Sequence, residues 1–96
     1  MEKDIVTYFE SAIKTEIYHD NGILHEERWT DKEGIVHRKD GPSVIYNRLS
    51  NPYEFWYING NNITEEVNEW LGKHNIPDWR EWTKKEKSLF KLKFVK

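Results

Sequence analysis

Apolar residues near the start of the chain recur at helical spacing. Within residues 4–14 they are Ile5, Val6, Phe9, Ala12 and Ile13. Positions one, four, seven and eight residues after the first lie on the same side of an α-helix, and Asp4 can cap the first turn. The pattern therefore predicts an amphipathic helix over residues 4–14 that covers one face of a sheet.

From residue 15 to residue 63, short apolar runs alternate with turn residues. The turn signals are Asn21-Gly22, Glu33-Gly34, Asp40-Gly41-Pro42, Asn51-Pro52 and Asn59-Gly60. Asn-Gly is the strongest of them, because both central residues of a type I′ hairpin turn have positive φ. Short strands between such turns predict an antiparallel meander of four or five strands.

Part of this region repeats. Gly22 and Gly34 are twelve residues apart, and so are His25 and His37, while Asn59-Gly60 begins a third, degenerate copy. Short units of this kind stack as hairpins, each of which covers the next. The meander is therefore predicted to consist of hairpin repeats.

Beyond residue 63 the apolar spacing is helical. Val67 and Trp70 share one helix face, and Pro77 ends this first helix. Thr83 and Glu86 have the spacing of a capping box, which predicts a second helix over about residues 84–91. The apolar residues of the tail alternate with lysines, which is typical of an edge strand.

The composition limits the size of the core. Only 36% of the 96 residues are hydrophobic, but 15% are aromatic, and aromatic-rich chains are seldom disordered. The length allows one domain. We therefore predict a single α+β domain over residues 1–96, with an N-terminal helix (4–14), a β-hairpin repeat sheet (15–63) and a C-terminal helical segment with a lysine-rich tail (64–96). A thin core and open sheet edges also favour a homodimer.

Two stretches of the chain resemble a known repeat. They are His37-Arg38-Lys39-Asp40-Gly41-Pro42-Ser43 and Phe55-Trp56-Tyr57-Ile58-Asn59-Gly60. Together they resemble the W-Y-x-N-G and H-R-x-D-G-P-A repeats of small proteins of tailed bacteriophages, which are similar to MORN-variant β-hairpin repeats. The resemblance spans residues 17–60. It departs from the pattern at Ser43, where the repeat has Ala, and at His25-Glu26-Glu27 in the first copy.

This resemblance implies a function but no reaction. It implies a phage-encoded protein in the host cytoplasm that modulates or inhibits a host protein, such as a defence or toxin–antitoxin component. The motif residues themselves have a structural explanation, because Gly41 permits a tight turn, Pro42 fixes φ and Asp40 accepts backbone amides. We expect His37 and Arg38 to brace this turn or a neighbouring strand.

Catalytic and metal-binding patterns are poorly represented in the sequence. The chain has no cysteine, so it has no thiolate zinc ligand and no cysteine nucleophile. Ser43, His37 and Asp40 bracket one tight turn, which leaves little freedom to orient a base between them. We therefore expect a non-enzymatic protein without metal or cofactor. No apolar run approaches the roughly 20 residues of a membrane span, which favours a cytoplasmic protein.

Positive charge collects at the C-terminal end of the chain. The formal net charge is −2, yet residues 83–96 contain six lysines and one glutamate. Tryptophans adjoin this segment, and Trp and Arg are among the residues that dominate binding hot spots. The predicted binding surface consists of Trp79, Arg80, Trp82, Lys84, Lys85, Lys87 and Lys91.

Two kinds of partner fit this surface. A host protein with an acidic face is the first. RNA or a nucleotide is the alternative: the tryptophans would stack on bases, the lysines would hold phosphates, and the protein would act by sequestering its ligand. The negative net charge opposes non-specific binding to nucleic acid, so the host protein is the preferred prediction.

Overall fold

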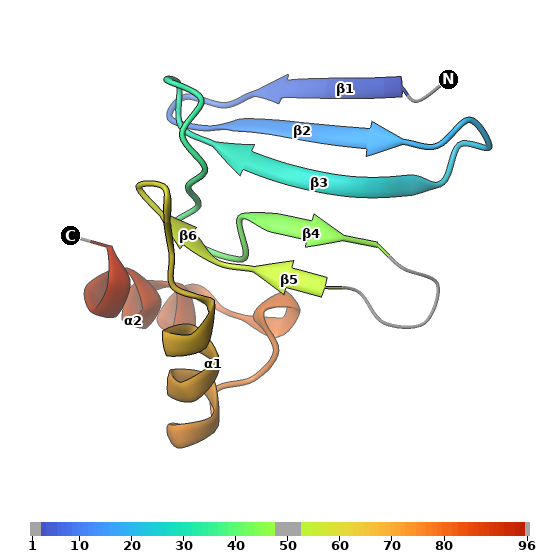
Figure 1. Cartoon of the computed structure of the whole chain (residues 1–96). Helices are drawn as coiled ribbons and strands as arrows, with labels where there is room; N and C mark the ends of the chain where they lie inside the picture. Colours follow the sequence, from blue (N-terminus) through green and yellow to red (C-terminus); the bar gives the residue numbers. More distant parts are fainter. Residues whose placement is uncertain (1–2, 48–52, 96) are drawn as a thin grey trace.

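The computed structural model describes residues 3–47 and 53–95 and has an α+β fold (Figure 1). Five antiparallel strands form one sheet in chain order, β1 (Lys3–Tyr8), β2 (Ile13–Tyr18), β3 (Leu24–Thr30), β4 (Val44–Tyr46) and β5 (Tyr53–Phe55). The elements that follow are the hairpin of β6 (Tyr57–Ile58) and β7 (Asn61–Asn62), helix α1 (Thr64–Lys73), the 3₁₀-helix η1 (Trp79–Glu81) and helix α2 (Lys84–Phe94).

The helix predicted over residues 4–14 is wrong, because this segment forms β1 and the start of β2. All six residues of β1 pair with β2, and the Phe9 N–H donates to the Ala12 carbonyl in the turn between them. Ile5 and Val6 therefore point to opposite faces of the sheet. Since β1 is exposed on both faces, its apolar residues need not alternate with polar ones, and the sequence lacked the period of a half-buried strand.

The predicted antiparallel meander is confirmed. Asn59 and Gly60 have φ of 50° and 81°, both positive as a type I′ turn requires. Asn21-Gly22 departs from that turn type, because only Gly22 of this pair has a positive φ, of 83°. The turn predicted at Asn51-Pro52 lies outside the described residues.

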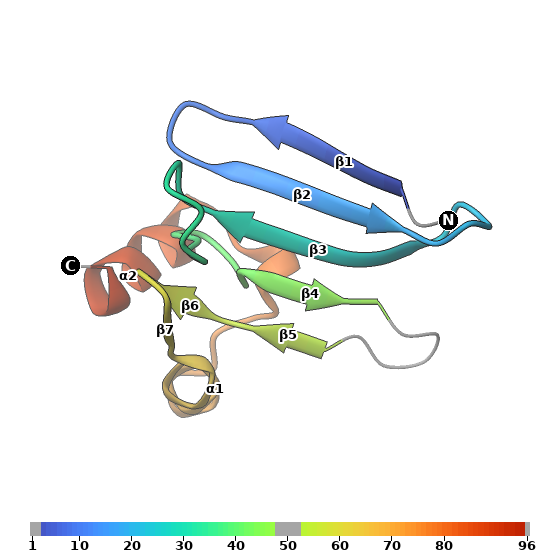
Figure 2. The same cartoon turned by 45° about the horizontal axis from the view of Figure 1, so that its top comes forward.

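The strand register sorts the side chains onto two faces of the sheet, since directly paired residues point the same way. One face, here called the helix face, carries Lys14, Glu16, Glu27, Trp29, Ile45 and Glu54. The other, here called the open face, carries Val6, Tyr8, Ile13, Ile17, Val44, Tyr46 and Phe55. Figure 2 views the open face, with α2 behind the sheet.

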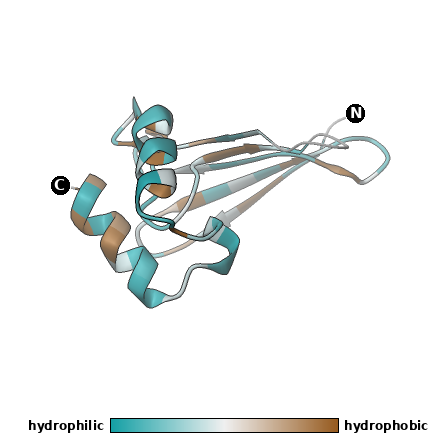
Figure 3. Ribbon diagram, turned by 90° about the horizontal axis from the view of Figure 1, so that it is seen from below, coloured by the Kyte–Doolittle hydropathy of each residue, from teal (hydrophilic) through white to brown (hydrophobic). Residues whose placement is uncertain are grey.

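The hydrophobic core lies at one end of the molecule, between β6 and the helices. It consists of Trp56, Ile58, Val67, Trp70, Trp82 and Phe90. The ring centroids of Trp56 and Phe90 are 5.2 Å apart, and those of Trp82 and Phe90 are 5.6 Å apart. Figure 3 shows the helices gathered at this end, while the strands extend well beyond them.

Helix α2 begins as predicted but continues further. Thr83 and Glu86 form a complete capping box at its start. The tail is not an edge strand, because the helix runs to Phe94. Phe90 and Phe94 are four residues apart, so both reach Trp70, with ring centroids at 6.1 and 5.5 Å. Leu92 would share their face in a strand but is 81% exposed on the helix.

Candidate functional site

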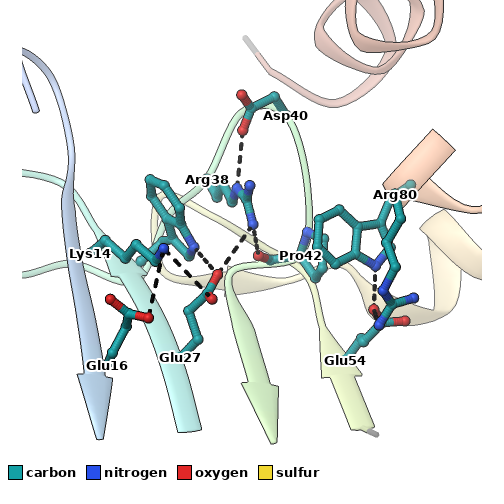
Figure 4. Close-up of polar contacts among 10 residues, drawn as sticks. Lys14, Glu16, Glu27, Arg38, Asp40, Pro42, Glu54 and Arg80 are labelled. Carbon is teal, nitrogen blue, oxygen red and sulfur yellow. Dashed lines mark hydrogen bonds and ion pairs between the residues drawn. The ribbon is translucent and has the colours of Figure 1, made fainter. Parts of the chain in front are cut away.

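The Asp-Gly-Pro turn holds the Arg38 side chain against the backbone. Arg38 Nε donates to Asp40 Oδ1 at 3.0 Å, and Nη1 donates to the Pro42 carbonyl at 3.1 Å (Figure 4). A Cβ atom on Gly41 would lie 2.9 Å from Arg38 Cζ, closer than such contacts normally come. Glycine is therefore needed here for the approach of the guanidinium.

The two halves of the repeat motif bind each other. His37 Nδ1 accepts the Asn59 N–H at 2.8 Å, so the first half holds the turn of the second. The buried Ser43 hydroxyl donates to the Tyr57 carbonyl at 2.9 Å and accepts the Tyr57 N–H at 3.1 Å. An alanine at this position would form neither bond. His37 and Arg38 thus brace the turn and the neighbouring strand, as expected.

Arg38 also lies between two tryptophans. Its Cζ atom is 4.2 Å from the ring centroid of Trp29 and 5.3 Å from that of Trp79. Phe9 stacks on Trp29, with ring centroids 5.4 Å apart and an interplanar angle of 19°. Trp29 Nε1 donates to Glu27 at 2.7 Å, which fixes the ring on the sheet. Aromatic and guanidinium groups therefore form one layer on the helix face.

Trp79 and Arg80, both predicted binding residues, are already bound to β5. The half-buried Trp79 donates its indole N–H to Glu54, and Arg80 Nη2 lies 3.0 Å from the same carboxylate (Figure 4). Arg80 Nη1 is also 3.1 Å from Asp78, and its Cζ is 4.8 Å from the Trp79 ring. Both side chains therefore have partners within the molecule, although Arg80 stays exposed.

Trp82 does not belong to the predicted surface. Its side chain is only 7% exposed, it packs against Phe90, and its indole N–H donates to the Pro77 carbonyl at 2.8 Å. Trp82 was predicted on the surface because it is close to the lysines in sequence. In the structure the chain turns inward between η1 and α2, which buries it. The aromatic part of the surface must therefore come from elsewhere.

The predicted lysines fall on two sides of α2. Lys84, Lys87 and Lys91 are spaced i, i+3 and i+7, so they form a stripe along one flank of the helix, whereas Lys85 points further outward. None of these four forms an ion pair with another described residue. Hydrogen bonds from Thr83 lower the pKa of Glu86, the one carboxylate on α2. That carboxylate caps the helix and does not neutralise the stripe.

Lys91 borders a cavity of about 330 Å³ on the helix face, here called the basic groove. Its lining residues are Phe9, Ser11, Ala12, Trp29, His37, Arg38, Lys39, Asp40 and Lys91. The lining combines the aromatic rings of Phe9 and Trp29 with the exposed residues Lys39 and Lys91. Sequence reasoning missed Phe9, Trp29 and Lys39, because Phe9 was assigned to a helix and its contact with Trp29 follows only from the β1–β2 turn.

Ser43, His37 and Asp40 do not form a catalytic arrangement. Each of them is hydrogen-bonded to a different residue and none to another of the three. Within residues 3–47 and 53–95, no three His, Asp or Glu side chains gather in a way that could hold a metal ion.

Comparison with models of protein families, with curated proteins and with solved structures found no match to this chain. The resemblance to phage repeats therefore stays a prediction. In the described part of the chain, no helix combines the length and the apolar character needed to cross a membrane.

Proposed function

We propose that this chain is a non-enzymatic binding protein whose partner is another protein, and that the basic groove contacts an acidic surface of that partner. In line with the repeat resemblance, the partner is a host protein and the chain a phage-encoded modulator of it. The observation that carries the proposal is the stripe of Lys84, Lys87 and Lys91, which forms no ion pair with another described residue and reaches the aromatic lining of the groove at Lys91.

The charge distribution supports an acidic partner. The chain as a whole is slightly negative, so the positive potential at the groove is local and directional. Such a patch speeds encounter with a surface of opposite charge and orients it. Phe9, 48% exposed at the edge of the groove, adds apolar contact area of the kind found at the centre of protein interfaces.

The tryptophans favour a protein over nucleic acid. A base-stacking site needs a free aromatic ring face. Trp29 already packs against Phe9 and Arg38, and Trp79 packs against Arg38 and Arg80. A nucleic acid would therefore find the lysines but no prepared stacking platform, and binding through lysines alone would be weak at physiological salt.

The test is affinity capture from host lysate with a charge-reversal variant. We expect the tagged chain to capture a host protein with and without nuclease, and K84E/K87E/K91E to lose it. The matched control is K32E/K73E/K93E, which changes the net charge equally at exposed sites away from the groove and should keep the partner. Capture that disappears with nuclease, or a high A260/A280 ratio that falls after a salt wash, would point to nucleic acid and sink the proposal.

A further inference from the structure

β1 is the outer strand of the sheet, and no described strand lies on its far side (Figure 1). All six of its residues are exposed, including Val6 at 44% and Tyr8 at 75%, although β1 pairs with β2 along its whole length. An edge strand of this kind presents unpaired N–H and C=O groups to the solvent. The fold thus offers a ready template for another strand.

The hydrogen-bonding pattern of the β1–β2 pair shows which N–H and C=O groups of β1 face the solvent. In the β1–β2 turn, Phe9 N–H donates to the Ala12 carbonyl at 2.8 Å. Hydrogen-bonded and non-hydrogen-bonded pairs alternate from this point along the ladder. Every second residue of β1 therefore bonds to β2, while Asp4, Val6 and Tyr8 turn their backbone groups outward.

Only the start of β1 carries the charged residues that usually protect a sheet edge, Lys3 and Asp4. Residues 5–8 contain no proline and no charge, and three of the four are β-branched. The register shift in this sheet lies between β2 and β3, and the pairing of β1 with β2 is continuous from Lys3 to Tyr8. The opposite edge is different, because β5 has only three residues and η1 packs beside it through Trp79 and Arg80.

We propose that β1 is a self-association site, which pairs antiparallel with β1 of a second copy across a two-fold axis. In the register centred on Val6, this residue lies opposite its own copy, and Asp4 lies opposite Tyr8. These are the three residues whose backbone groups face outward, so all of them enter hydrogen-bonded pairs. A register centred on Ile5 would place Tyr8 opposite residue 2, outside the described strand.

The register centred on Val6 also avoids like charges within the described strand. At both ends of the paired strands, Lys3 of one copy lies opposite Phe9 of the other, so neither Lys3 nor Asp4 faces a like charge across the described strand. Ile5 of each copy lies opposite Thr7 of the other. A two-fold contact uses β1 of both copies and closes on itself, so it predicts a dimer and not a fibre.

The first test is the mass of the full chain in solution. Light scattering at about 100 μM protein should give twice the chain mass of 11.7 kDa. Val6→Pro removes an outward N–H and takes no donor from the β2 ladder, so we expect a monomer with an unchanged circular dichroism spectrum. Val6→Thr keeps that N–H and should stay dimeric. A monomeric wild type, or a Val6→Pro dimer as stable as the wild type, would overturn the proposal.

A second test uses the absence of cysteine and does not depend on how the proline variant folds. Val6→Cys, treated with a short bismaleimide, should be crosslinked to a second copy. Ile35→Cys is the control, because Ile35 is 42% exposed but lies in the connection between β3 and β4. Equal crosslinking of both variants would refute pairing through β1. The crosslinking reaction contains only the purified chain and no partner protein. Its result is therefore independent of the function proposed for the basic groove.

Discussion

At the scale of single residues, Arg38 connects most of the features of the helix face. Its guanidinium bonds to Asp40 and to the Pro42 carbonyl, and it packs against Trp29 and Trp79. An arginine can do this because its planar head donates in several directions while its faces stack on aromatic rings. The motif that the sequence marked as a turn therefore also lines the basic groove.

Gly41→Ala should destabilise the fold through Arg38. The added methyl group forces the guanidinium away, and the loss of its bonds to Asp40 and Pro42 should cost about 1–3 kcal/mol in urea unfolding. In an Arg38→Ala background the same change should cost much less. Gly72→Ala is the control: it lies in α1 with nothing within 4 Å of the new methyl, and should stabilise by about 1 kcal/mol. Equal effects at the two glycines would contradict the assigned contact.

His37 should make stability depend on pH. Burial, and secondarily the charge of Lys39, lowers its pKa below the usual 6.5, and its neutral Nδ1 accepts the Asn59 N–H. The unfolded chain thus binds a proton more readily than the folded one, so this contribution is complete above pH 6.5 and declines as the pH falls through the folded pKa. His37→Gln should flatten the urea-unfolding profile between pH 7 and pH 5. An unchanged slope would show that another group titrates.

At the scale of elements, the strands and helices were predictable where one face is buried. The capping box of α2 and the turn at Asn59-Gly60 depend on local backbone geometry, so the sequence identified them correctly. β1 was not predictable in this way, because it buries neither face and therefore has no alternation of polar and apolar residues. The end of α2 was ambiguous for a related reason, since Phe90, Leu92 and Phe94 fit a strand and two of them fit a helix.

Phe94→Ala and Leu92→Ala distinguish a helical tail from a tail that forms an edge strand. On the helix, Phe94 packs on Trp70 and Phe90, so its loss should cost about 2–3 kcal/mol of unfolding free energy. Leu92 is 81% exposed, and its replacement should change stability by less than about 0.5 kcal/mol. Similar losses for both variants in urea unfolding would instead favour an edge strand.

At the scale of the whole molecule, the protein is flat and has two unlike ends. It measures 42 by 32 by 22 Å, with the core between the helices and β6 at one end and an uncovered sheet at the other. The sequence indicated a thin core and a basic C-terminal segment, and both are present. The position of the groove was not predictable, because it depends on a turn in the N-terminal hairpin that brings Phe9 onto Trp29.

The central claim is that the basic groove binds an acidic protein surface. Its most direct measurement is the dissociation constant of the purified partner for K84E/K87E/K91E and for K32E/K73E/K93E. We predict that K84E/K87E/K91E binds at least about tenfold more weakly than the control, a difference of about 1.4 kcal/mol or more, and that the wild-type affinity falls with rising salt. Equal dissociation constants for the two variants would contradict the account.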